Sequence, residues 1–454
     1  MTPVLDESVL EGLRSELRGP VIGPADADYE TARRVHNAMI DKRPAVIARC
    51  MGVADVIAAL RSGLAHDLPI AVRGGGHNVA GKAICDDGIV IDLSAMKGMR
   101  VDPVNRVARA QAGLTWGEFD RETQAFGLAT TGGAVSTTGI AGLTLGGGIG
   151  WLQRKHGLTC DNLLSADVVT ADGRFLTASE TENTDLFWGL RGGGGNFGIV
   201  TSFEYRLHPV GQVLAGAVLH PFSAAKDAFE FFREYTETAP DEVMADFVLG
   251  TLPDGEPGVF LFVFYGGAPD EGEAVLRPVR EFGRPVDDLI QPMSYCEVQQ
   301  AFDEDFPYGI QNYWKSSNLR GLSDDAVDTM IAFYERVPSP KPMAFIEQLG
   351  GAVGRVAADA TAFGHREAEF DLVIAASWSD PAGTERHIEW TRDFWEAMQP
   401  YSTRSVYVNY LSEEGQDRVR AAYGEEHYAR LIDLKRRYDA ANVFRNNQNI
   451  DPEG

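Results

Sequence analysis

Residues 69–78 read PIAVRGGGHN, a short apolar run that leads into an arginine, three glycines and His77. The apolar run predicts a buried strand, and the glycines predict a turn at its end. Glycine adopts positive φ without strain and lets a backbone approach a ligand closely. A histidine after such a turn is either an exposed or capping residue or a functional group, and the residue type alone does not separate the two.

Two more glycine clusters lie at residues 132–150 and 191–200. Apolar residues recur between the glycines, so neither cluster is a low-complexity segment. Backbone N–H groups in glycine turns converge on anions such as phosphate. Three clusters together favour a phosphate-bearing ligand, although any one of them alone would also fit an ordinary turn.

Two familiar phosphate-binding motifs fit these clusters poorly. Residues 76–82 match the P-loop pattern GxxxxGK, but Ala83 stands where a Ser or Thr hydroxyl would bind Mg²⁺. Residues 193–198 match GxGxxG, yet no obvious helix follows and no acidic residue ends a second strand about 20 residues later. The glycines therefore favour a ligand site of another kind.

Length and charge limit the class of protein. A chain of 454 residues is long enough for two or three domains. Its net charge of −25 argues against nucleic acid and anionic membranes as partners. Four cysteines do not make a disulfide framework, the acidic N-terminus predicts no signal peptide, and no apolar run approaches the ~20 residues that span a bilayer. We therefore expect a soluble, cytoplasmic protein.

The glycine clusters end near residue 205, which suggests how the chain divides. The expected elements include strands at 69–73, 88–93, 106–112 and 258–264 and helices at 53–64, 116–126 and 385–398. We predict a ligand-binding domain at 1–206, completed by 401–454, and a substrate-binding domain of mixed helices and strands at 207–400.

Five motifs in this order resemble those of one family: residues 69–78, 146–162, 185–201, 407–410 and 444–450. The chain is similar over nearly its whole length to the berberine-bridge-enzyme-like flavin oxidases, which belong to the vanillyl-alcohol-oxidase group. The resemblance implies an α+β protein. Its parts would be a PCMH-type FAD-binding domain of two α/β subdomains and a substrate domain with an antiparallel sheet flanked by helices.

The resemblance also implies that FAD is attached covalently at two points. His77 matches the histidine that bonds to the flavin 8α carbon, and Cys160 matches a cysteine that bonds to C6 in the bicovalent members. In isolation Cys160 reads as a buried small apolar residue. A second bond requires it to be accessible and activated, because the thiolate is the reacting form. His156 departs from the family, where a tyrosine is common at that place.

Other residues come to the cofactor site through the resemblance, and no metal is expected. Residues in the glycine clusters would contact the FAD pyrophosphate, ring and nucleotide, and a C-terminal pair would lie near the flavin. These residues are Arg73, Gly74, Gly75, Gly76, Asn78, Gly81, Gly133, Thr138, Gly139, Gly142, Gly147, Gly150, Ile199, Val200, Asn447 and Gln448.

Tyr410 matches the tyrosine usually assigned as the base in such oxidases. A tyrosine, with a pKa of about 10, serves near neutral pH only if a positive charge or hydrogen bond stabilises its phenolate, and Lys315 is the candidate neighbour. If residues 406–410 form a strand, Tyr407 and Tyr410 point to opposite faces, so Tyr407 would only support the site. Both tyrosines could instead be packing residues.

The function expected from the resemblance is hydride transfer from a C–OH centre to flavin N5, with O₂ as acceptor and H₂O₂ as product. Two covalent links suggest a bulky substrate such as an oligosaccharide or natural product. The alternatives are an amine oxidase of the hydroxynicotine type, a dehydrogenase with another acceptor, and a non-catalytic flavin carrier. Trp314, Tyr313 and Tyr295 are candidates to line the substrate pocket.

Overall fold

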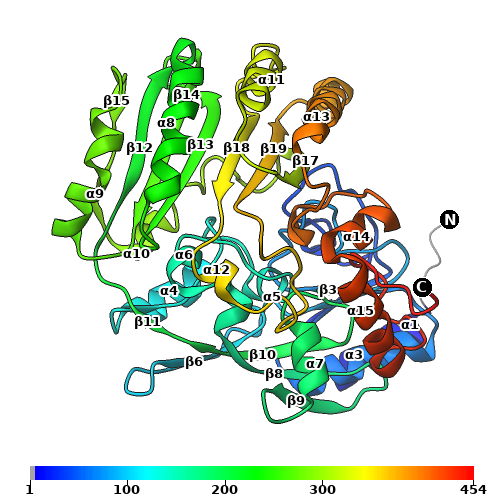
Figure 1. Cartoon of the computed structure of the whole chain (residues 1–454). Coiled ribbons are helices and arrows are strands. Elements are labelled where there is room, and N and C mark those ends of the chain that lie inside the picture. The colour runs from blue at the N-terminus through cyan, green and yellow to red at the C-terminus, as the bar shows by residue number, and fades with distance from the viewer. Residues whose placement is uncertain (1–5) are drawn as a thin grey trace.

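The computed structural model describes residues 6–454 and contains three main sheets (Figure 1). The first has the order β1-β2-β4-β3, and its last three strands run parallel. Its strands are β1 (Val21–Ile22), β2 (Val46–Arg49), β3 (Ile70–Arg73) and β4 (Ile89–Asp92). Helix α3 (Val53–Ala65) packs on β4 and connects two parallel strands, so the glycine turn follows the carboxyl end of β3.

The second sheet is antiparallel, in the order β5-β6-β10-β8-β9. Its strands are β5 (Met99–Asp102), β6 (Val107–Gln111), β8 (Leu163–Val169), β9 (Phe175–Ser179) and β10 (Ile199–Arg206). Helices α4 (Trp116–Gln124) and α7 (Thr184–Leu190) contact this sheet, and α5 (Ile140–Leu145) and α6 (Gln153–His156) lie between them in the chain. Helix α5 lies within the second glycine cluster, and β10 begins at the end of the third.

The third sheet has eight strands, in the order β15-β12-β14-β13-β18-β19-β17, with β16 paired to β12. The strands are β12 (Val213–Pro221), β13 (Val243–Thr251), β14 (Pro257–Tyr265), β15 (Asp287–Asp288), β16 (Gln291–Met293), β17 (Gln311–Asn318), β18 (Met343–Gln348) and β19 (Phe370–Trp378). Helices α8 (Ala225–Thr238), α9 (Pro269–Glu281), α11 (Asp324–Tyr334) and α13 (Thr384–Met398) lie against one face (Figure 1).

The opposite face of this sheet looks toward the first part of the chain. On β13, Val243, Ala245 and Phe247 pack in the core beneath the helices. The alternating residues Met244 and Asp246 instead line a cavity between the sheet and the glycine clusters. The period of two along a strand is what gives one sheet these two different faces.

The C-terminal segment returns to the first part of the chain through α14 (Gln416–Tyr423) and α15 (Glu425–Tyr438). Lys435 on α15 is fully buried, and its Nζ donates to the carbonyl oxygens of Asn196 and Phe444 and to the Asp439 carboxylate. These bonds hold residues 444–448 beside the third glycine cluster. The last motif thereby reaches the site that the first three motifs build.

Short elements complete the chain: α1 (Glu7–Glu16), α2 (Tyr29–Ala32), β7 (Leu128–Ala129), β11 (His208–Pro209), α10 (Tyr295–Val298), α12 (Ala352–Arg355) and the 3-10 turns η1 (Thr159–Asn162), η2 (Phe222–Ala224), η3 (Pro381–Gly383), η4 (Gln399–Tyr401) and η5 (Val408–Tyr410). Within residues 6–454 no helix is both long and apolar enough to cross a membrane.

The α+β fold class and the expected elements quoted from the sequence are confirmed, to within a few residues at their ends. The strand expected at 406–410 is wrong, because residues 408–410 form η5. The exact domain limits at residues 206 and 400 stay a prediction.

Candidate active site

The glycine turn after β3 crosses the N-terminal end of α5 at backbone contact. A Cβ added to Gly75 would lie 2.5 Å from the Gly139 nitrogen, and one added to Gly139 would lie 2.4 Å from the Gly75 nitrogen. No side chain fits at either position without moving backbone. Gly76 has φ +68°, a conformation that favours glycine. The close approach of these two glycine clusters therefore requires glycine at both positions.

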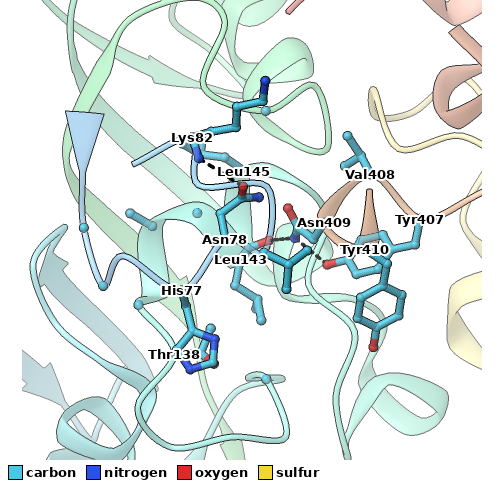
Figure 2. A pocket seen from close by; sticks show the side chains of 18 of the residues that line it. His77, Asn78, Lys82, Thr138, Leu143, Leu145, Tyr407, Val408, Asn409 and Tyr410 are labelled. Carbon is cyan, nitrogen blue, oxygen red and sulfur yellow. Dashed lines mark hydrogen bonds between the residues drawn. The ribbon is translucent and has the colours of Figure 1, made fainter. Parts of the chain in front are cut away.

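The glycine clusters and the third sheet enclose a cavity of about 350 Å³. We call its two walls the glycine side, formed by cavity-lining residues within 74–79, 133–151 and 194–200, and the sheet side, formed by Met244, Asp246, Val248, Trp314, Met343, Phe345 and Glu347. Residues 407–410 and 446–448 line it as well. Figure 2 shows His77 and Tyr410 at opposite sides of the part that it draws.

His77 lies at this cavity in a fixed orientation. Its Nε2 is 3.1 Å from Thr137 Oγ1, and its ring stacks on His36 with the centroids 3.8 Å apart. Tyr308 packs edge-on against both rings. Burial, together with the neighbouring His36, lowers the pKa of His77 to about 3. The imidazole is therefore neutral at ordinary pH, which is the form that can act as a nucleophile.

Cys160 lies apart from this arrangement. It is fully buried in η1, packs against Leu158 and Tyr407, and does not line the cavity. Its Sγ is 3.8 Å from Asp161 Oδ1, and burial raises the pKa of the thiol further above its usual value. A second flavin bond requires an accessible, activated thiolate. In the structure the Cys160 thiol is neither accessible nor activated.

Tyr407 and Tyr410 share one side of η5, with ring centroids 5.0 Å apart. Residues three apart nearly eclipse in a 3-10 turn, so the opposite faces expected for a strand are wrong. The Tyr407 oxygen accepts hydrogen bonds from the Gly148 amide (2.9 Å) and Asn409 Nδ2 (2.7 Å). The Tyr410 hydroxyl donates to the Glu347 carboxylate at 3.0 Å.

Lys315 does not support Tyr410. Its Nζ pairs with the Glu414 carboxylate at 2.6 Å, lies over the Trp395 ring, and stays outside the cavity lining. Burial and the nearby Glu347 raise the pKa of Tyr410 well above its usual value. The positive charge expected beside Tyr410 is thus replaced by a carboxyl group.

Three buried carboxyl groups form a row across neighbouring strands. Asp246 on β13 pairs directly with Glu347 on β18, which pairs with Asp371 on β19, and we call these residues the acidic row. Burial raises the pKa of Asp246 and of Asp371 to about 7, and that of Glu347 well above its usual value. No motif in the sequence indicates this row. The only signal was an isolated acidic residue within each apolar strand.

Most of the residues expected at the cofactor line the cavity. They are Gly74, Gly75, Gly76, Asn78, Gly133, Thr138, Gly139, Gly142, Gly150, Ile199, Val200, Asn447 and Gln448. Three others lie behind it: Arg73 pairs with Asp92 at 2.7 Å, while Gly81 and Gly147 have φ +66° and +122°.

Among the aromatic candidates, Trp314 lines the cavity, whereas Tyr313 and Tyr295 do not. Tyr295 is fully buried in a core cluster with Trp151 and Phe264. Lining residues that the sequence analysis did not single out include Trp151, Asn409 and Asn446. Asn409 and Asn446 lie inside the motifs at 407–410 and 444–450, so the resemblance could have identified them as site residues.

Residues 44–179 match the family model of an FAD binding domain, and residues 406–451 match the model described as berberine and berberine like. An FAD-linked oxidoreductase from Dictyostelium discoideum is 30% identical over 441 residues, which cover 96% of this chain and 95% of that protein. The chain belongs to the berberine-bridge-enzyme-like family. It is an FAD-dependent oxidoreductase.

Further comparisons agree with this assignment in sequence or in fold. (R)-6-hydroxynicotine oxidase from Paenarthrobacter nicotinovorans is 33% identical, with 96% of this chain and 98% of that protein covered. The crystal structure of 6-hydroxy-D-nicotine oxidase from Arthrobacter nicotinovorans superposes with a TM-score of 0.88 at 30% identity, covering 96% and 98% of the two chains. A xylooligosaccharide oxidase from Myceliophthora thermophila shares the fold, with a TM-score of 0.86, 22% identity and 98% of each chain covered.

The residues present fit FAD. The glycine side offers backbone without side chains where a phosphate-bearing ligand must approach closely, as at Gly75 and Gly139. Asn447 lines the cavity, and its buried Oδ1 accepts no hydrogen bond from any described residue. A buried acceptor of this kind fits a donor group on a ligand.

Proposed function

We propose that this chain is an oxidase that takes a hydride from a carbon bearing a hydroxyl group. The observation that carries the proposal is the hydrogen bond from Tyr410 to Glu347 at the cavity. Tyr410 can hold the substrate hydroxyl, and Glu347 can accept the proton. Bound FAD would supply N5 as the hydride acceptor and pass the electrons to O₂, giving H₂O₂.

The proton path uses two side chains of this protein. The Tyr410 oxygen accepts the substrate hydroxyl proton while its own proton moves to Glu347. Burial raises the pKa of Glu347, which makes its carboxylate a stronger base than an exposed one. Only the ionised carboxylate can accept the proton, so kcat/KM rises with pH. This replaces the expectation that Lys315 stabilises a Tyr410 phenolate.

We propose a single covalent attachment, through His77. Its neutral imidazole lines the cavity, whereas the Cys160 thiol is buried behind it. A bulky substrate was expected only because of the second link, so small alcohols join oligosaccharides and larger natural products as substrates to test. A cytoplasmic location stays a prediction.

Amine oxidation is the second candidate. It is favoured by the similarity to (R)-6-hydroxynicotine oxidase over 96% of this chain and by two carboxyl groups on the sheet side, Asp246 and Glu347. A carbon next to nitrogen can deliver the same hydride. The proton then leaves nitrogen rather than oxygen.

The test is a panel of alcohols and matched amines, with H₂O₂ measured under air. Peroxide formed with an alcohol at one equivalent per turnover supports the proposal, and peroxide formed only with amines favours the second candidate. Reoxidation of reduced protein by air is then compared with reoxidation by an artificial acceptor. Slow reaction with air but fast reaction with the acceptor would make the protein a dehydrogenase. Bound flavin with no turnover of any substrate would indicate a non-catalytic flavin carrier.

A further inference from the structure

Asp246 lies in the cavity wall, and one of its two carboxyl oxygens is buried without a partner in the described part of the chain. Its residue is 6% exposed, and its Oδ1 accepts no hydrogen bond from any described residue. Leaving a buried polar group unpaired costs about 1–3 kcal/mol, and more for a charged group. A cost of this size at a cavity wall points to a ligand that offsets it.

No counter-ion within the protein serves this carboxylate. Across residues 6–454, no salt bridge involves Asp246 or Glu347. Burial and the neighbouring Asp246 and Asp371 raise the pKa of Glu347, and the Glu347 carboxylate already accepts the hydrogen bond from Tyr410. Two adjacent carboxyl groups can both ionise only if a positive charge comes close to them.

The surroundings of Asp246 select the kind of cation. Met244 and Val248 flank it on β13, and Phe345 and Trp314 also stand on the sheet side. These side chains offer apolar contact and aromatic rings, which suit an organic cation rather than a hydrated metal ion. A ligand that complements this wall carries a protonated nitrogen on an apolar framework.

We propose that Asp246 binds a protonated basic nitrogen of the substrate, so that the natural substrate is an amine or an amino alcohol. The inference rests on the proposed function only in placing the substrate in this cavity. It holds whether the hydride leaves a carbon bearing oxygen or one bearing nitrogen. Glu347 remains the proton acceptor, and Asp246 is the binding group beside it.

The test compares two probes of nearly equal shape, benzylammonium and benzyl alcohol, on the flavin-loaded protein. Binding is followed by the change in flavin absorbance at about pH 8, where a carboxyl group with a pKa of about 7 is mostly ionised. The variants are Asp246→Asn and, as a matched control, Asp120→Asn. Asp120 is another buried carboxyl with a raised pKa, about 8, and it does not line the cavity.

We expect the wild type and Asp120→Asn to bind benzylammonium at least about tenfold more tightly than benzyl alcohol, and Asp246→Asn to lose that preference. A preference that survives Asp246→Asn overturns the proposal, as does equal binding of the two probes by the wild type. If Asp246→Asn fails to retain flavin, the comparison of the two probes on the wild type tests the proposal by itself.

The two proposals fail separately. A wild type that oxidises an alcohol with peroxide formation, yet binds both probes equally, contradicts only the cation site. A wild type that prefers benzylammonium but produces no peroxide with any substrate contradicts only the proposed oxidase function.

Discussion

The two walls of the cavity are built in different ways. The glycine side comes from segments that carry their information locally, such as residues 74–77, and it presents mostly backbone. The sheet side brings together Asp246 and Glu347, about 100 residues apart, through strand register alone. A backbone wall suits a cofactor that is the same throughout a family. A wall of strand side chains can change from member to member, so substrate choice belongs there.

The largest expected effect comes from removing the proposed covalent anchor on the glycine side. His77→Ala should abolish covalent flavin, because no other histidine and no cysteine among the described residues lines the cavity. The measurement is flavin in the acid-precipitated protein, by absorbance and by fluorescence in a denaturing gel. Cys160→Ala is the matched control and should stay yellow. Covalent flavin that survives His77→Ala but disappears in Cys160→Ala would reverse the assignment.

Next to the sheet side, Tyr410→Phe removes the hydroxyl that donates to Glu347 and that we propose relays the substrate proton. We expect kcat to fall by roughly 10²–10³-fold with unchanged flavin content, in the range that general base groups contribute. In Glu347→Gln, kcat should fall by a similar factor, and kcat/KM should no longer rise with pH. Tyr401→Phe, in η4 and away from the cavity, controls for loss of a tyrosine hydroxyl. Normal turnover in Tyr410→Phe would take Tyr410 out of the mechanism.

The sheet side should also make stability depend on pH. The pKa of Asp246 rises to about 7 on folding, so the native state holds its proton more tightly than the unfolded chain does. This contribution to stability is present below about pH 4 and is lost as pH rises toward 7. Asp246→Asn should therefore gain stability relative to wild type over that window, on the order of 3 kcal/mol.

Urea unfolding at about pH 4 and pH 8 measures this difference, with each protein referred to its own value at the lower pH. Glu389→Gln, an exposed change on α13, is the control. A difference between Asp246→Asn and wild type that does not change with pH would mean that Asp246 is ionised without penalty in the native protein.

The smallest expected effect concerns the backbone crossing on the glycine side. Gly139→Ala places a Cβ against the Gly75 nitrogen and should lower the free energy of unfolding by about 2 kcal/mol. Gly211→Ala, where a Cβ would meet nothing within 4 Å, should change it little. The measurement is urea unfolding of both variants under the same conditions. Equal stability of the two would show that the crossing tolerates a side chain.

Much of the fold and of the glycine side could be predicted from the sequence. The strand before His77 and the cluster at 132–150 are local patterns, and glycine runs report directly on backbone conformation. The failures share one cause. The 3-10 turn at 408–410 and the pairing of Lys315 with Glu414 both depend on contacts with distant segments.

The sequence by itself determined the family, the cofactor class and the histidine that stands next to the flavin site, because these are carried by short runs with special backbone requirements. The side chains that meet on the sheet side of the cavity could be known only from the tertiary structure. Asp246, Glu347 and Asp371 become neighbours through the pairing of β13, β18 and β19. No local pattern records strand register, and the low-dielectric surroundings that shift the pKa of these groups exist only when the sheet closes over the glycine clusters.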